Sequence, residues 1–137
     1  MIYFLIVTHG DFGAYLLEAA EGIAGQAASG TRALSLSNRW GIQEIRDKLQ
    51  KAVQEMASPD GLILLTDMLG GTPANTALSL VQNQDKIRVL TGLNLYMLIS
   101  GLTHRKDLSL EDLAQKMLED GKKSILDAKS LFLRKVG

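Results

Sequence analysis

The sequence predicts an α/β protein with an open, doubly wound and mostly parallel sheet. Two continuous apolar runs, at 2–7 and 61–66, are typical of strands that are buried on both faces. Shorter and more mixed runs at 31–36 and 86–92 suit flanking strands. Helical patterns separate these runs, and such alternation produces right-handed crossovers within one parallel sheet. We expect the common strand order 2-1-3-4.

The expected helices follow from apolar residues at helical spacing. The first, over 12–25, presents a stripe of Leu16, Leu17, Ala20 and Ile23. The second, over 41–56, presents a stripe of Ile42, Ile45, Leu49, Val53 and Met56, with charged residues opposite. Further helices are expected over 72–82, 94–102 and 109–129.

The last part of the chain allows two interpretations. Ser109 and Asp112 form a capping box that opens the helix over 109–129, and Gly121 weakens that helix. The tail SLFLRKVG, residues 130–137, mixes apolar and basic side chains. It either finishes this helix or forms a short antiparallel edge strand.

The composition of the chain excludes several classes of function. The 137 residues fit a single domain, 1–137, and the 15 basic residues balance the 15 acidic ones. This balance gives no electrostatic reason to expect nucleic acid as a partner. The chain has no cysteine, which excludes disulfides and thiolate metal sites. The apolar N-terminal run is too short to span a bilayer and lacks the features of a signal peptide, so we expect a cytoplasmic protein.

A histidine and an aspartate follow two strands that should be neighbours. His9 lies just past the carboxyl end of the first strand, and Asp67 lies just past the carboxyl end of the third. In an open α/β sheet, functional groups gather at the carboxyl ends of the strands, where the strand order reverses. A carboxylate that accepts the proton of one ring nitrogen leaves the other nitrogen free as a nucleophile. The alternative is that His9 only caps the next helix or bonds within a loop.

The stretch TDMLGGTPANTA, residues 66–77, combines a turn with a helix start. Gly70 and Gly71 allow a tight turn, Thr72 suits an N-cap, and Pro73 suits the first helical turn. The free N–H groups at the start of a helix favour an anion. The alternative is an ordinary connection with good turn chemistry. Neither glycine stretch matches a nucleotide-binding fingerprint.

Three collinear motifs carry a resemblance to a known family. They are IVTHG at 6–10, LLTDMLGGTPANTA at 64–77 and VLTGLNLYMLIS at 89–100. In these motifs and their order, the chain resembles the IIA component of the mannose family of the phosphoenolpyruvate-dependent sugar phosphotransferase system.

The resemblance implies a phosphoryl carrier that needs no cofactor and no metal. The family's IIA domain accepts a phosphoryl group from HPr on the histidine that matches His9 and passes it to a IIB component. Membrane IIC and IID components take part indirectly. Asp67 matches the acidic partner of that histidine. The residues expected to bind the phosphoryl group are Gly10, Gly70, Gly71 and Thr72. Those expected to dock protein partners are Met68, Leu69, Pro73 and Asn75.

Apart from the resemblance, Arg39 and Trp40 follow the second strand on the same edge as His9 and are docking candidates by their own chemistry, since arginine suits a phosphate or an acidic partner and tryptophan is a common interface anchor. The alternative for these two residues is a solvated loop with one packed aromatic side chain.

The family is usually dimeric, which gives the tail a role as a C-terminal edge strand exchanged between subunits. No linker or IIB domain follows in this sequence, so we expect a free-standing IIA component that is cytoplasmic or peripheral to the inner membrane through its transporter partners. Ala74 and Leu69 stand where the family often has aromatic residues. Both are expected near the rim that docks the IIB partner.

The same residues allow three other interpretations of the function. The same surface would serve a regulatory module that signals by its phosphorylation state or by binding partners, without sugar transport. His9 and Asp67 would also serve a small hydrolase as a dyad, although the sequence offers no obvious serine or cysteine nucleophile. A relative that supplies a dihydroxyacetone kinase is a third interpretation, which the GGTP motif fits less well. His104 is expected at the surface in a polar connection, and Asp11 in the first turn of a helix.

Overall fold

The computed structural model describes residues 1–25, 29–68 and 72–136. It contains a four-stranded sheet whose strands are all parallel and run in the order β2-β1-β3-β4. The predicted fold class and strand order are therefore confirmed. The strands are β1 (Tyr3–His9), β2 (Thr31–Leu36), β3 (Leu62–Thr66) and β4 (Ile87–Leu90).

The central strands are the two that carry continuous apolar runs. β1 and β3 lie side by side, with Val7 opposite Thr66 in the register. All five residues of β3 are buried. Because both strands end at the same edge, the residues that follow Val7 and Thr66 emerge together at the carboxyl edge of the sheet.

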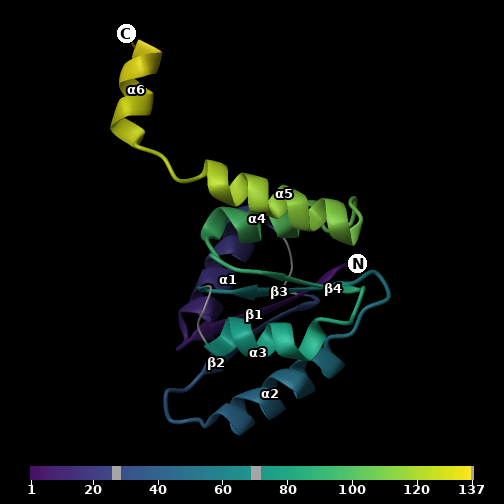
Figure 1. Cartoon of the computed structure of the whole chain (residues 1–137). Helices are drawn as coiled ribbons and strands as arrows, with labels where there is room; N and C mark the ends of the chain where they lie inside the picture. The colour runs from purple at the N-terminus through teal and green to yellow at the C-terminus, as the bar shows by residue number, and fades with distance from the viewer. Residues whose placement is uncertain (26–28, 69–71, 137) are drawn as a thin grey trace.

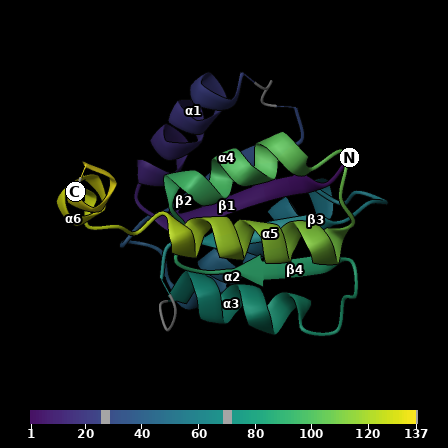
Figure 2. The ribbon, with the colours of Figure 1, turned by 90° about the horizontal axis from the view of Figure 1, so that it is seen from above.

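Helices cover both faces of the sheet (Figures 1 and 2). The apolar side chains of α1, α4 and α5 pack on one face and those of α2 and α3 on the other. The helices are α1 (Phe12–Ala24), α2 (Ile42–Glu55), α3 (Thr72–Val81), α4 (Leu95–His104), α5 (Leu110–Lys123) and α6 (Ala128–Val136). No helix within the described residues is long and apolar enough to cross a bilayer.

The predicted apolar stripes of α1 and α2 are each wrong at one terminal residue. Ile23 is exposed, because the buried stripe of α1 continues from Ala20 to Ala24, which packs against the core. Ile42 is also exposed, because it is the first residue of α2 and only the turns beyond it cover the sheet. Both side chains remain in solvent although they have the spacing of core residues.

The helix predicted over 109–129 is wrong at its end. Its start agrees, since the Oγ of Ser109 accepts a hydrogen bond of 3.2 Å from the N–H of Asp112. The helix α5 stops at Lys123, however, and Asp127 then caps a new helix by accepting a 3.1 Å hydrogen bond from the N–H of Ser130. Gly121 lies inside α5 and is buried, and a Cβ there would collide with Met97 of α4.

The tail therefore forms the helix α6, and no edge strand is present in the described part of 130–137. The helix α6 projects away from the body of the molecule (Figure 1) and leaves Phe132 and Leu133 exposed. Exchange of this segment between two copies stays a prediction.

Candidate functional site

His9 is the last residue of β1 and stands at the carboxyl edge of the sheet. Side chains alternate along a strand, so His9 shares its face with Leu5 and Val7. Those two residues belong to the core beneath α2 and α3. The ring of His9 is 42% exposed, so a partner in solution can reach it.

Asp67 follows β3 and holds His9 at two points. Its Oδ2 accepts a 3.0 Å hydrogen bond from the backbone N–H of His9 and lies 2.7 Å from the ring Nδ1. Its Oδ1 accepts a 3.0 Å bond from the backbone N–H of Met68. The carboxylate is only 11% exposed. The expected meeting of His9 and Asp67 is confirmed, and both oxygens of the carboxylate are engaged.

The hydrogen bond at Nδ1 determines how the ring is presented. An ionised carboxylate only accepts hydrogen bonds, so the nitrogen facing it must carry the proton. In the neutral ring, the other nitrogen, Nε2, then keeps its lone pair. The ring is also held in orientation, because Oδ2 of Asp67 binds both the ring and the backbone N–H of His9. The arrangement presents Nε2 as an aimed nucleophile.

Asp67 stays ionised at neutral pH. Burial raises the pKa of its carboxyl group, but the hydrogen bonds from the backbone and ring of His9 lower it by more, and the charge of a protonated ring adds to this effect. The net pKa lies below the ordinary value of 3.8. The acceptor that orients His9 is therefore present throughout the physiological range.

Gly10 makes the turn that follows His9. Its φ of 68° lies in the left-handed region, which favours glycine. Its N–H donates to the carbonyl of Leu36 at 3.1 Å, and its own carbonyl accepts from Thr8 Oγ1 at 3.0 Å. A Cβ at Gly10 would meet no atom within 4 Å, so the space beside the turn is open.

The helix α3 begins at Thr72, at the place where the sequence predicts a helix start. The chain reaches it shortly after leaving β3 at Thr66, so its N-terminal end lies toward the carboxyl edge of the sheet. Gly70, Gly71 and Leu69 lie outside the described residues, as do the side chains of Thr72 and Pro73.

The predicted docking residues differ in exposure. Met68 and Asn75 are exposed, as is Arg39. Trp40 is half-buried beneath Lys48, whose Nζ lies 4.7 Å from the ring centroid. Ala74 is only 1% exposed, so its expected place on the docking rim is wrong. It lies on the inward face of α3, where Ala77 and Val81 repeat at helical spacing.

Two residues near the site were missed from the sequence. Phe12 opens α1 only three positions after His9, and its side chain is exposed. Thr8 is buried, and its hydroxyl bonds to the turn that follows His9. The sequence offers no signal for Phe12, because it stands four residues before Leu16 and reads as part of the predicted apolar stripe. The structure shows that the buried stripe of α1 begins at Gly13 instead and leaves Phe12 outside it. Thr8 gave no signal, because it reads as part of a buried strand.

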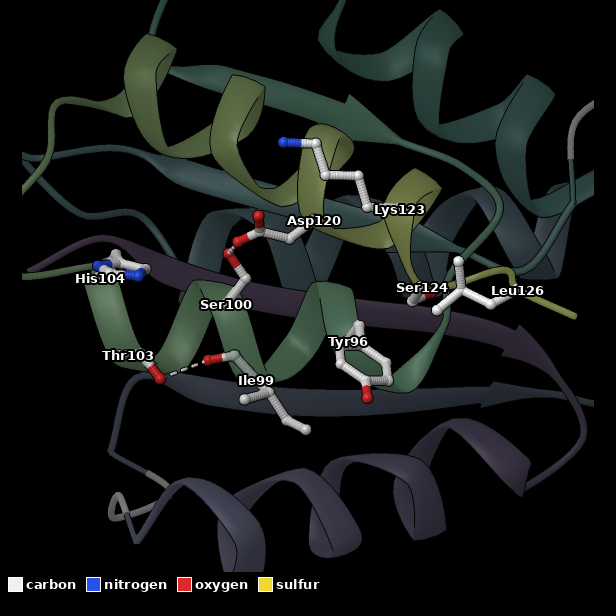
Figure 3. A pocket seen from close by; sticks show the side chains of 9 residues that line it. All are labelled: Tyr96, Ile99, Ser100, Thr103, His104, Asp120, Lys123, Ser124 and Leu126. Carbon is white, nitrogen blue, oxygen red and sulfur yellow. Dashed lines mark hydrogen bonds between the residues drawn. The ribbon is translucent and has the colours of Figure 1, made fainter. Parts of the chain in front are cut away.

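The remaining candidates are His104, which lies apart from His9, and Asp11, whose side chain makes no hydrogen bond among the described residues that would support a role at the site. His104 is the last residue of α4 and is half-buried, so its expected place in a polar surface connection is wrong. It lines a cavity of about 360 Å³ between α4 and α5, where Ser100 donates a 2.7 Å hydrogen bond to Asp120 (Figure 3). Because α4 runs back from the carboxyl edge, His104 lies toward the opposite edge. Asp11 is the exposed N-cap residue of α1, and its side chain makes no capping hydrogen bond.

Comparison with known proteins gives the family. Residues 3–118 match the family described as PTS system fructose IIA component. The chain belongs to this family. The PTS system fructose-specific EIIA component of Bacillus subtilis is 31% identical over 117 residues, which cover 85% of this chain and 80% of that protein. The fold of this IIA component also matches the crystal structure of phosphotransferase system component EIIA from Streptococcus agalactiae. That match has a TM-score of 0.83 and 33% identity, and covers 95% and 99% of the two chains.

A longer relative shares only part of its length with this IIA component. The PTS system mannose-specific EIIAB component of Escherichia coli is 26% identical over 125 residues. The match covers 90% of this chain but only 38% of that protein. These findings confirm the resemblance to mannose-type IIA components, which are phosphotransfer components of the sugar phosphotransferase system. Among the residues that the structure describes, no group of three or more His, Cys, Asp or Glu side chains is placed to hold a metal ion.

Proposed function

We propose that this IIA component accepts a phosphoryl group from phospho-HPr on Nε2 of His9 and passes it to a IIB component. The observation that carries the proposal is the 2.7 Å contact between Asp67 Oδ2 and His9 Nδ1. It fixes the proton on Nδ1 and leaves Nε2 as the reactive atom. The exposure of the ring allows a second protein to bring its phosphoryl group to that atom.

The reaction needs no proton transfer at His9. The lone pair of Nε2 attacks phosphorus, the N–P bond of the donor breaks, and its electron pair returns to the donor nitrogen. The proton on Nδ1 stays in place, so the phosphorylated ring gains positive charge. The largely buried carboxylate of Asp67 balances this charge and stabilises the phosphohistidine. Transfer to the IIB component reverses these bond changes.

Backbone groups near His9 suit a phosphoryl group in transit. The helix α3 begins a few residues after Asp67, and the start of a helix favours negative charge. Gly10 leaves open space beside the ring. We assign phosphate contact to the start of α3, at Thr72 and the preceding Gly70 and Gly71, and close approach to Gly10.

The surface around His9 suits a protein partner. Phe12 and Met68 are exposed apolar residues, and each lies within a few positions of His9 or Asp67. Exposed polar side chains, Arg39 and Asn75, follow β2 and begin α3. Apolar anchors with a polar rim are typical of protein interfaces. We assign this surface to HPr and IIB in turn, and IIC and IID components meet the phosphoryl group only after IIB.

We also propose that the protein is a homodimer. The helix α6 has nine residues, which is too short for a stable isolated helix in water. Its exposed Phe132 and Leu133 would be covered by a second copy.

The decisive experiment is phosphorylation in a defined mixture of phosphoenolpyruvate, enzyme I, HPr and this protein. We expect one acid-labile, base-stable phosphoryl group per chain, lost in His9→Ala and kept in the control His104→Ala. Chase with a IIB component should then remove it. Phosphate retained by His9→Ala would contradict the proposal, and a phosphorylated chain that passes its group to no IIB component would favour a regulatory module.

A further inference from the structure

We infer that Thr8 is a positioning residue for His9, acting through the turn that follows it. Thr8 precedes His9 in β1 and is 1% exposed, so it reaches neither a partner nor the phosphoryl group. Its hydroxyl nevertheless connects the segments on both sides of the turn. The kinetic part of this inference rests on the proposed function, whereas the geometric part does not.

The Thr8 hydroxyl makes two hydrogen bonds with the chain beyond His9. It donates to the carbonyl of Gly10 at 3.0 Å and accepts from the N–H of Gly13 at 3.3 Å. The N–H of Gly10 donates to the carbonyl of Leu36 in β2 at 3.1 Å. Gly10 is therefore held at both its N–H and its carbonyl, once by the neighbouring strand and once by Thr8.

Gly13 provides an independent sign that this contact is specific. A Cβ at Gly13 would lie 2.7 Å from Thr8 Oγ1 and 2.8 Å from Thr8 Cγ2. Real Cβ atoms do not approach this closely, so any other residue at 13 would displace Thr8 or the first turn of α1. Glycine at 13 lets the buried hydroxyl reach the backbone of the helix.

The contact between the His9 ring and Asp67 depends on the turn that follows His9. Within the described residues, the ring has one hydrogen-bond partner. That partner, Asp67, belongs to a different strand, so the 2.7 Å contact requires β1 to deliver the ring at a fixed point. Loss of the Thr8 hydroxyl would free the carbonyl of Gly10 and leave the buried N–H of Gly13 without its acceptor. The turn would then shift, and the ring would leave the geometry in which Nδ1 faces the carboxylate.

The test uses Thr8→Val, which keeps the size and branching of the side chain and removes only the hydroxyl function. Thr8→Ser restores the hydroxyl and serves as the rescue. Thr91→Val is the matched control, because the hydroxyl oxygen of Thr91 is also buried and has no hydrogen-bond partner among the described residues. Each protein is examined as the whole chain, with thermal melting to establish the folded fraction.

The first measurement is nitrogen NMR of the unphosphorylated His9 ring, which reports the fraction of the ring protonated on Nδ1. We expect Thr8→Val to lower that fraction and Thr8→Ser and Thr91→Val to keep it. A folded Thr8→Val protein with an unchanged ring signature would overturn the inference, whether or not the protein accepts phosphate.

The second measurement is the rate of phosphoryl transfer from phospho-HPr at equal concentrations of folded protein. Loss of an outer partner that orients a metal-bound histidine typically costs about 10- to 100-fold in affinity or activity, and Thr8 orients His9 in the same indirect way. We expect a loss of about tenfold in Thr8→Val, with recovery in Thr8→Ser. Equal rates in wild type and Thr8→Val would overturn the kinetic part, and absence of transfer in wild type would instead contradict the proposed function.

Discussion

Replacement of Asp67 by asparagine changes charge and hydrogen bonding while it almost preserves shape. The two carboxylate oxygens serve three donors, namely the backbone N–H of His9, its Nδ1–H and the backbone N–H of Met68. An asparagine offers one oxygen and one NH₂ group in the same place. Whichever way the amide is turned, at least one donor faces another donor.

The magnitude follows from the two orientations. If the oxygen keeps the contacts with His9, the N–H of Met68 loses its acceptor. If the NH₂ group faces His9, the ring is driven to carry its proton on Nε2, which is the atom that must attack. A hydrogen bond to a charged group, as between the Asp67 carboxylate and the phosphorylated ring, contributes about 1.5–3 kcal/mol. At about 1.4 kcal/mol per tenfold change, losing that contribution in the transition state should slow transfer by about 10- to 150-fold.

Stopped-flow transfer from phospho-HPr to Asp67→Asn measures this loss, and thermal melting checks that the variant is folded. The variant also lacks the charge that balances the phosphorylated ring, so the hydrolysis of its phosphohistidine should be followed in parallel. Forward and reverse rates equal to those of wild type, in a folded variant, would refute the role given to Asp67.

Further predictions concern pH, assembly and helix packing. Because its hydrogen bonds hold the pKa of Asp67 below 3.8, ionised Asp67 stabilises the fold above that pH, and this contribution is lost as the pH falls further. Urea unfolding should therefore show the stability difference between wild type and Asp67→Asn shrinking below pH 3.8, and a difference independent of pH would contradict this. Removal of residues 129–137 should convert the dimer to a monomer, which light scattering detects as a fall to about half of the particle mass. A truncated protein that still has the mass of a dimer would count against α6 as the dimer contact. Gly121→Ala should destabilise the protein by about 1–3 kcal/mol through overpacking against α4. The control Gly22→Ala, in open space on α1, should stabilise it by about 0.5–1 kcal/mol, and equal effects of the two variants would refute the packing role.

The strand order and the meeting of His9 with Asp67 were predictable for a topological reason. Continuous apolar runs mark the two central strands, and parallel strands end at the same edge of the sheet. The residues just past the ends of these two runs must then emerge close to one another. Only the contact distance and the second hydrogen bond, from the backbone of His9, required the structure.

Other features depend on information that periodicity does not contain. The pattern over 109–129 is helical throughout, but the capping bond from Ser130 to Asp127 starts a new helix. Ala74 has an inward position that depends on the rotation of α3 about its axis. Thr8 reads as a strand residue, because the partners of its hydroxyl come from the turn and from α1.

The most direct test of the central claim is to locate the phosphoryl group on the ring of His9. The protein is labelled with ¹⁵N, phosphorylated through enzyme I and HPr, and studied by nitrogen and phosphorus NMR. The geometry at Asp67 predicts a single phosphohistidine, with phosphorus bonded to Nε2 of His9 and the proton kept on Nδ1. Phosphorus on Nδ1, or on any other residue, would contradict the account.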